Sequence, residues 1–249
     1  MIMDEMQKNA PIVIIGAMES EMSLIKARMD KVESYELCGF PVVAGTLNGI
    51  PAVAALNQVG MVNSAVLTTL LVERCKPACI ISQGTAGSYS EELRTGDIVL
   101  GKVIRNTNCA HMRPADCRRL EEITEGVWDE MQFCSSDPEL LALAASVSYE
   151  HGRIVEGSIA SCDFWSFDPE SIHAIRERFG SDCEEMETYA AAQACSRLQI
   201  PFLSVRAISN NELTGESFLA DAGEWCQKFV LDIVGAMAEK RKKQGRDSV

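Results

Sequence analysis

Residues 11–17 read P-I-V-I-I-G-A, a short apolar run that is rich in β-branched residues. Such a run is typical of a strand that is buried on both faces of a sheet. The run ends at Gly16-Ala17, and residues 18–29 then place methionine and isoleucine side chains at helical spacing. The stretch therefore predicts a strand, a turn and a helix, which is the repeating unit of an α/β fold.

The same kinds of signal continue along the chain. Residues 35–57 alternate between apolar and polar side chains and contain two turn signals, Gly39 and Asn48-Gly49, of which the second is a hairpin candidate. We expect further strands at 78–83, 97–104, 153–161 and 201–209, and helices at 65–75, 137–149, 168–179, 187–198 and 216–241.

No repeat, low-complexity stretch or linker interrupts this pattern, so we expect one α/β domain over residues 1–249, with frayed ends at 1–10 and 241–249. Two Asp-Pro pairs, at 137–138 and 168–169, are typical helix starts. Residues 105–136 have no clean period and predict a long loop that can hold one helix. A loop of this length is usually functional or an interaction segment.

The composition argues against several classes of protein. The chain has 23 basic and 36 acidic side chains and a net charge of −13, whereas a protein that binds nucleic acid needs a basic face. No apolar run is long enough to span a bilayer, and residues 1–10 lack the apolar core of a signal peptide. Ten cysteines without a C-x-x-C pair and three histidines without metal spacing predict buried thiols in a reducing cytoplasm, with neither a metal nor another cofactor.

Polar residues gather where the predicted strands end. The strand ends read G-A-M-E-S-E (16–21), Q-G-T-A-G-S (83–88), A-S-C-D-F-W (160–165) and R-A-I-S-N-N (206–211). Ligands of open α/β sheets bind beyond the carboxyl ends of the strands, so we expect these stretches to form one site.

Each stretch has a structural and a chemical interpretation. Glu19 and Glu21 either compensate the dipole of a helix start or include a base for water. The 83–88 stretch is either a plain turn or a cradle for an anion or a polar sugar. Phe164 and Trp165 either belong to the core or stack on a planar ring.

A further acidic stretch, C-E-E-M-E-T-Y at 183–189, contains Glu184, Glu185 and Glu187. We expect it to open a helix. Its carboxylates then either complement the helix N-terminus or accept hydrogen bonds from a diol.

The joint order of these motifs is more specific than any one of them. The chain reads G-A-M-E-x-E, V-G-x-V-x-x-A, G-T-A-G, T-G-D-I-V, D-F, E-M-E and R-A-I-S in succession. From Ile12 to about Val234 it resembles the purine nucleoside phosphorylase and nucleosidase superfamily, and it is most similar to the 5′-methylthioadenosine/S-adenosylhomocysteine nucleosidases. The resemblance implies a three-layer α/β sandwich with a central mixed sheet flanked by helices, a purine nucleoside as small-molecule partner, and a homodimer.

The resemblance also implies catalytic roles. Glu21 matches the glutamate that deprotonates the attacking water, and Thr85 and Arg206 match groups that help to hold that water. This chemistry suits the bond, because hydrolysis needs a general base while a carboxylate stabilises the oxocarbenium character of the ribose.

The substrate-binding residues follow from the same comparison. Met186 and Glu187 match residues that bind the ribose, with the Glu187 carboxylate on the 2′- and 3′-hydroxyls. Phe164 matches the ring that stacks on the purine, and the backbone of Trp165 matches the group that reads its edge. Ala86, Gly87 and Ser209 complete the expected site.

One departure concerns the leaving base. Asn210 stands where the methylthioadenosine nucleosidases carry the aspartate that protonates adenine N7. An amide cannot transfer a proton, and losing a general acid costs about 10²–10⁴-fold in rate. Three interpretations stay open: Asn210 reads O6 and N7 of a 6-oxopurine nucleoside, as we would expect of futalosine hydrolases; adenine nucleosides react with a proton relayed by water or Glu212; or the protein binds nucleosides without turnover.

Two further points concern the reaction and the 5′ side of the substrate. Phosphorolysis is the alternative to hydrolysis, but glutamates at the first strand end would repel phosphate. In the nucleosidases the region of residues 105–136 helps to build the 5′ pocket at the dimer interface. Here Arg113, Arg118 and Arg119 either face a carboxylate on the substrate or are solvated.

Overall fold

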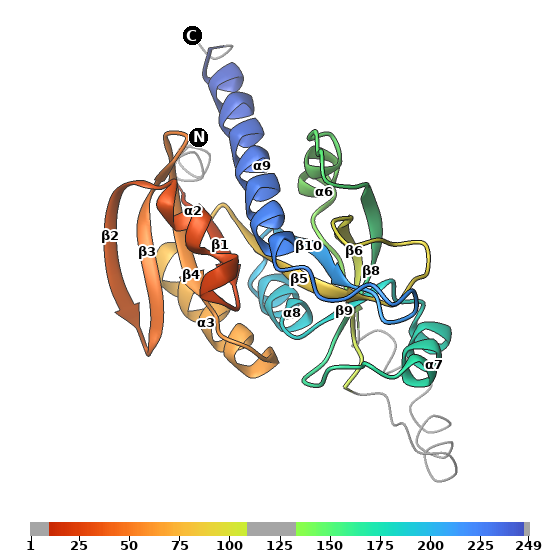
Figure 1. Ribbon diagram of the computed structural model, residues 1–249. Coiled ribbons are helices and arrows are strands. Elements are labelled where there is room, and N and C mark those ends of the chain that lie inside the picture. The colour runs from red at the N-terminus through yellow and green to blue at the C-terminus, as the bar shows by residue number, and fades with distance from the viewer. Residues whose placement is uncertain (1–9, 109–132, 247–249) are drawn as a thin grey trace.

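The computed structural model describes residues 10–108 and 133–246. One mixed sheet forms the centre of this structure (Figure 1). Its strand order is β10-β6-β8-β9-β5-β1-β4-β3-β2, and β7 pairs with β6. Strand β10 also pairs with β5, so that β5, β10, β6, β8 and β9 close into a ring from which β1 to β4 extend. The strands are β1 (Ile12–Gly16), β2 (Asp30–Leu37), β3 (Phe40–Leu47), β4 (Ile50–Leu56), β5 (Cys79–Ser88), β6 (Ile98–Asn106), β7 (Phe133–Cys134), β8 (Ile154–Ser161), β9 (Cys183–Glu185) and β10 (Phe202–Asn210).

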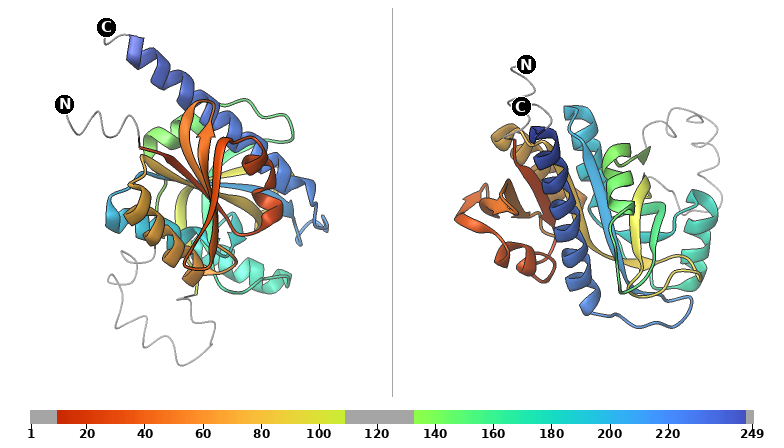
Figure 2. Two further views of the ribbon diagram at one scale, coloured as in Figure 1. Left: turned by 90° about the vertical axis from the view of Figure 1, so that its left-hand side faces the viewer. Right: turned by 90° about the horizontal axis from the view of Figure 1, so that it is seen from above.

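Helices cover both faces of the sheet, as Figures 1 and 2 show. They are the 3₁₀ turn η1 (Glu19–Glu21) and the α-helices α2 (Ser23–Ala27), α3 (Met61–Cys75), α6 (Pro138–Ala145), α7 (Pro169–Phe179), α8 (Thr188–Leu198) and α9 (Asp221–Arg246). Side chains of α2, α6 and α9 pack with one face of the sheet, and those of α3 and α8 pack with the other. The expected three-layer α/β architecture with a central mixed sheet is therefore confirmed.

Strand β1, which residues 11–17 predicted, packs against the helices on both faces of the sheet. Ile12 and Ile14 belong to the core under α9, whereas Val13 and Ile15 belong to the core under α3 and α8. All four side chains are fully buried. Burial of an apolar side chain of this size is worth about 1.5–3 kcal/mol, so this short strand stabilises both layers.

Several local predictions are confirmed. The turn signals at Gly39 and Asn48-Gly49 lie between β2, β3 and β4, which pair antiparallel in succession. Asp137 accepts hydrogen bonds from the backbone N–H groups of Glu139 and Leu140, and α6 starts with proline as expected.

Other local predictions were wrong. Residues 18–29 form η1 and the short α2 in place of one helix, and residues 183–185 form β9 rather than a helix start. The pairing of β9 with both β5 and β8 outweighs the local helical preference of that stretch. Helix α9 runs from Asp221 to Arg246, whereas the expected helix ran from residue 216 to residue 241.

The loop predicted for residues 105–136 contains strand residues near both of its ends. Residues 105–106 extend β6, and Phe133–Cys134 form β7 beside it. The predicted helix within this segment, and Arg113, Arg118 and Arg119, lie outside the described residues.

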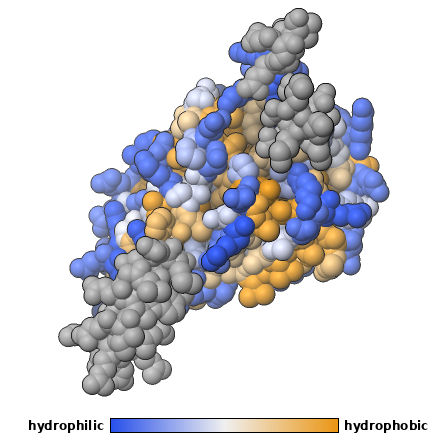
Figure 3. All heavy atoms as spheres, turned by 180° about the vertical axis from the view of Figure 1, so that it is seen from behind, coloured by the Kyte–Doolittle hydropathy of each residue, from blue (hydrophilic) through white to orange (hydrophobic). Residues whose placement is uncertain are grey.

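The surface mixes hydrophilic side chains with apolar patches, as the rear face in Figure 3 shows. Exposed apolar groups occur on most folded proteins, so these patches do not by themselves identify a binding face. Across residues 10–108 and 133–246, we find no helix with the length and apolar character needed to cross a bilayer. The eight cysteines in the same ranges are free thiols, of which five are buried.

Candidate active site

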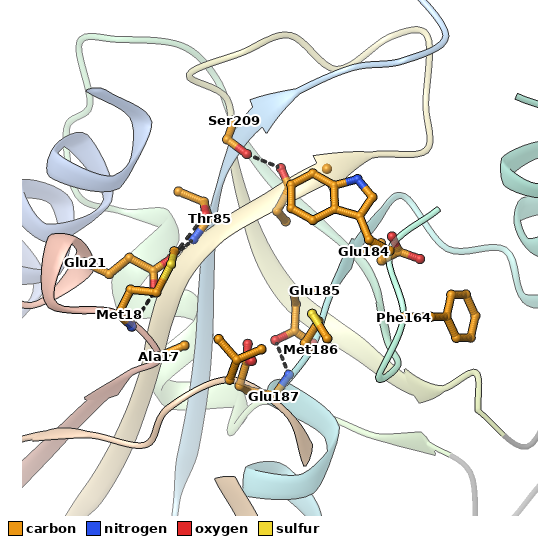
Figure 4. Close-up of a pocket in the computed structure, with 14 residues that line it drawn as sticks. Ala17, Met18, Glu21, Thr85, Phe164, Glu184, Glu185, Met186, Glu187 and Ser209 are labelled. Atoms are coloured by element: carbon orange, nitrogen blue, oxygen red, sulfur yellow. Dashed lines mark hydrogen bonds between the residues drawn. The ribbon is translucent and has the colours of Figure 1, made fainter. Parts of the chain in front are cut away.

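A cavity of about 260 Å³ opens where several strands end (Figure 4). Nine of the eleven residues predicted for the site line it, and two do not. The lining residues among those predicted are Glu21, Thr85, Ala86, Gly87, Phe164, Trp165, Met186, Glu187 and Ser209. The structure therefore brings together side chains from η1, β5, β10, the segment after β8 and the β9–α8 junction.

Glu21 and Thr85 are in direct contact. The Glu21 Oε1 atom accepts hydrogen bonds from the Thr85 backbone N–H at 2.9 Å and from Thr85 Oγ1 at 3.1 Å, while Oε2 accepts from the Met18 N–H at 3.2 Å. Gly84 makes this approach possible, because a Cβ atom there would lie 2.8 Å from Glu21 Oε1. The carboxylate is thus fixed at the cavity wall by a short turn and a small residue.

The second acidic group of the cavity is Glu187, which is the N-cap residue of α8. Its Oε1 accepts a hydrogen bond from the Gly60 N–H at 2.9 Å. Burial, followed by the charge of the neighbouring Glu185, raises the pKa of Glu187 from 4.5 to about 8. At neutral pH the carboxyl therefore holds its proton much more readily than an ordinary glutamate does.

Arg206 is buried and is not among the residues that line the cavity. Its Nη2 atom donates to Glu185 Oε2 at 2.8 Å, to Thr188 Oγ1 at 2.6 Å and to Ser82 Oγ at 3.0 Å. The same Glu185 oxygen accepts from the backbone N–H groups of Glu187 and Thr188. Arg206 and Glu185 together therefore hold the start of α8, which carries Glu187.

Asn210 is the other predicted residue that does not line the cavity. Its Nδ2 atom donates to Glu212 Oε1 at 3.1 Å, and its Oδ1 accepts from Ser209 Oγ at 3.0 Å. A Cβ atom on Gly87, which does line the cavity, would lie 3.4 Å from Asn210 Nδ2. The amide thus lies directly beside the cavity wall.

Apolar side chains form the more exposed part of the site. Phe164 and Trp165 are 42% and 56% exposed, and Met18 and Val59 are also partly open to solvent. Figure 4 shows Phe164 on the side of the site opposite Glu21. The segment that carries the two rings is tied to α3 by a hydrogen bond of 2.8 Å from the Met61 N–H to Asp163 Oδ1.

Sequence reasoning missed the separate positions of Glu184 and Glu185. It placed both at a helix start, whereas they are neighbours in β9. Both residues line the cavity, and Glu185 is also paired with Arg206. The signal that could have separated them is the alternation of a strand, which sends adjacent side chains in opposite directions. Among the described residues, no three His, Cys, Asp or Glu side chains are grouped as metal ligands.

Comparison with known proteins agrees with this architecture. A family model described as the phosphorylase superfamily matches residues 11–238. A 5′-methylthioadenosine/S-adenosylhomocysteine nucleosidase of Bacillus thuringiensis (strain Al Hakam) is 29% identical over 231 residues, which cover 90% of this chain and 97% of that protein.

Solved structures give the same result. The nucleosidase of that name from Neisseria meningitidis, in complex with methylthio-immucillin-A, has a TM-score of 0.75 and 29% identity, covering 90% of this chain and 98% of its own. The corresponding enzyme from Colwellia psychrerythraea, in complex with adenine, has a TM-score of 0.76 and 26% identity, covering 92% and 96%.

Proposed function

Because the chain belongs to the phosphorylase superfamily, we propose that it is a purine nucleoside N-ribohydrolase, which cleaves the N-glycosidic bond with water and releases the free base. The observation that carries the proposal is the Glu21 carboxylate, held at the cavity wall by the Thr85 backbone and hydroxyl. The similarity to nucleosidases, one of which is described in complex with adenine, supports it.

Glu21 acts as the general base in this proposal. A water molecule bound between Glu21 and Thr85 would transfer a proton to the carboxylate as it attacks the anomeric carbon. Both carboxylate oxygens already accept backbone N–H groups, so the carboxylate is oriented before substrate binds. A rigid base of this kind loses little freedom in the transition state.

Glu187 and Met186 bind the ribose. The Glu187 carboxyl accepts hydrogen bonds from the 2′- and 3′-hydroxyls, and its partial negative charge stabilises the oxocarbenium-like transition state. Arg206 acts through Glu185, because its guanidinium is bonded to that carboxylate and not to Glu21. We therefore assign Arg206 a positioning role instead of the contact with water that the resemblance implied.

The base lies against Phe164, with the Trp165 backbone at its edge and Ala86, Gly87 and Ser209 lining the remaining wall. Asn210 donates to the base from beside Gly87. The contact between Asn210 and Glu212 also supports a relay in which Glu212 supplies the proton that an amide cannot. The substrate is thus either a 6-oxopurine nucleoside or an adenine nucleoside such as methylthioadenosine or adenosylhomocysteine.

Hydrolysis fits the charges of the site better than phosphorolysis does. The carboxylates of Glu21, Glu184 and Glu185 line the cavity, and their negative charge disfavours phosphate. Arg206 is committed to Glu185, so it cannot serve as a free phosphate ligand without breaking a buried ion pair.

We further propose that the protein is a cytoplasmic homodimer. The free thiols of the described cysteines suit a reducing compartment. Light scattering after size exclusion should give twice the chain mass of 27.2 kDa, and a monomer mass would contradict the dimer. A contribution of residues 105–136 to the 5′ pocket stays a prediction, because residues 109–132 lie outside the described residues.

The test of the proposed base is the Glu21→Gln variant. We expect the rate of base release to fall by about 10²–10⁴-fold, because the amide cannot accept the proton from water. Glu19→Gln is the matched control: this neighbour is exposed and pairs with Lys26 at the surface, so its variant should retain activity. Equal activity of the wild type and the Glu21→Gln variant would sink the proposed mechanism.

A further inference from the structure

Glu184 has no role in the proposed reaction, although its side chain is buried and lines the cavity. We propose that Glu184 is a specificity-determining residue that accepts a hydrogen bond from N1–H of the leaving base, so that the substrate class is the 6-oxopurine nucleosides. This inference rests on the proposed function and decides between the two bases left open above.

The sheet register places Glu184 and Asn210 on opposite sides of Gly87, which lines the cavity. Gly87 of β5 is paired with Glu184 of β9 on one side and with Asn210 of β10 on the other. Neighbouring strands are about 4.8 Å apart, so the two backbones lie roughly 10 Å apart across a residue without a side chain. That span suits the edge of a purine, with its N1 toward one residue and its N7 and O6 toward the other.

The surroundings of Glu184 keep it an acceptor. Its Oε2 atom receives hydrogen bonds from Tyr89 Oη, from Ser166 Oγ at 2.9 Å and from Cys162 Sγ at 3.3 Å. Burial and the nearby Glu184 carboxylate raise the pKa of Tyr89, so its hydroxyl stays protonated and donates. Three donors therefore converge on Oε2, which acts as a hydrogen-bond acceptor toward all of them.

The other oxygen of Glu184, Oε1, can accept a further hydrogen bond from a ligand. Among the described residues it accepts one hydrogen bond, from the Ser166 N–H at 2.8 Å. A carboxylate oxygen has two lone pairs, so one position is open to a further donor. Asn210 likewise uses one N–H of its amide on Glu212 and keeps a second for O6.

The two bases present different edges to this pair. A 6-oxopurine carries a donor at N1 and an acceptor at O6, which complement a carboxylate and an amide N–H. Adenine carries an acceptor at N1, so the same arrangement would place two acceptors against each other. Leaving a buried polar group unpaired, or facing another acceptor, costs more free energy than one hydrogen bond contributes. The site should therefore discriminate strongly between 6-oxopurines and adenine.

A purely structural role for Glu184 is the competing explanation. Its bonds to Ser166 and Cys162 hold the segment that carries Phe164 and Trp165. Loss of that support would impair all nucleosides alike, whereas loss of a specific contact with the base would change the ratio between them. Selectivity therefore separates the two roles.

The experiment compares kcat/KM for inosine and adenosine, and for the 5′-methylthio derivatives of both, in the wild type and in Glu184→Gln. We expect the wild type to prefer the 6-oxopurine member of each pair. The variant should lower that preference by about 10- to 100-fold, the value of one hydrogen bond to a charged group. Tyr89→Phe removes a donor to the carboxylate but keeps the carboxylate, so its ratio should match that of the wild type.

An unchanged ratio in Glu184→Gln, or a wild-type preference for adenosine, would overturn the inference. Competitive binding of free hypoxanthine and adenine to the wild-type protein provides a test that needs neither the variant nor turnover. Hypoxanthine should bind at least 10-fold more tightly, and equal or reversed affinities would overturn the inference. Absence of base release from every nucleoside would instead contradict the proposed function, while the comparison of the two bases still tests Glu184.

Discussion

The Glu187 carboxyl is buried next to a second carboxylate, that of Glu185, and its pKa is raised to about 8. In the free protein at pH 7 it is therefore mostly protonated. Ribose hydroxyls that donate to Glu187 favour its ionised form, so binding of a nucleoside should lower this pKa and release a proton.

Calorimetry can measure that proton. Titration of a non-hydrolysable nucleoside analogue at pH 7, in two buffers that differ in ionisation enthalpy, should show release of up to about one proton per site. The release should vanish well above pH 8 and in the Glu187→Gln variant. A binding enthalpy that does not depend on the buffer at pH 7 would contradict the assignment of Glu187 to the ribose.

The same pKa has a consequence for stability. A carboxyl whose pKa is higher in the folded than in the unfolded protein stabilises the fold at pH values below its unfolded-state pKa. This stabilisation is lost as the pH rises through the folded-state pKa. Wild-type protein should therefore lose stability relative to Glu187→Gln between about pH 4.5 and pH 8. Urea unfolding of both proteins at pH 5 and pH 8 measures the difference.

Asn210 is the residue whose substitution should change which purine base the enzyme prefers as leaving group. An Asn210→Asp variant restores a group that can protonate N7, so the rate on adenine nucleosides should rise by about 10²-fold or more relative to inosine. The panel of adenosine, inosine, methylthioadenosine, adenosylhomocysteine and futalosine, scored by free base, measures this shift. If the order of substrates does not change, Asn210 does not act on the base.

At the scale of elements, the ion pair between Arg206 and Glu185 joins β10 to β9 and holds the start of α8. Both side chains are buried, and removing one partner leaves an uncompensated charge. Arg206→Met should therefore lower the free energy of unfolding by about 3–5 kcal/mol.

A double-mutant cycle tests this coupling. Glu185→Gln retains an oxygen for the backbone N–H groups of Glu187 and Thr188 but removes the charge. Combining it with Arg206→Met should cost less stability than the sum of the two single changes. Strict additivity in urea unfolding would show that the two residues are not coupled.

Some helices and strands could be predicted from the local sequence alone, and others could not. Residues 11–17 predicted β1 because its apolar run reflects burial on both faces, and the Asp-Pro pairs predicted helix starts because capping is a local interaction. Strand β9 was missed because Cys183–Glu185 is held by pairing with β5 and β8, which are distant in sequence. Glu184 was consequently assigned to a helix, and its place in the cavity wall stayed hidden.

At the scale of the whole molecule, the mixed sheet brings six separate stretches of the chain to one cavity. The order of motifs was enough to predict the family, the layers and most of the cavity wall, since strand ends meet at one edge of a sheet. The partners of buried side chains were not predictable in this way. Arg206 was expected at the water and is bonded to Glu185, a contact that depends on the relative placement of two strands.

Hydrolysis without phosphate is the central claim about this molecule, and the products of the wild-type enzyme test it most directly. Purine nucleosides are incubated in phosphate-free buffer and in buffer with phosphate, and both the free base and the sugar product are measured. We predict equal release of base in the two buffers, with free ribose or its 5′-substituted form as the sugar. Release that requires phosphate and yields a sugar 1-phosphate would contradict the account.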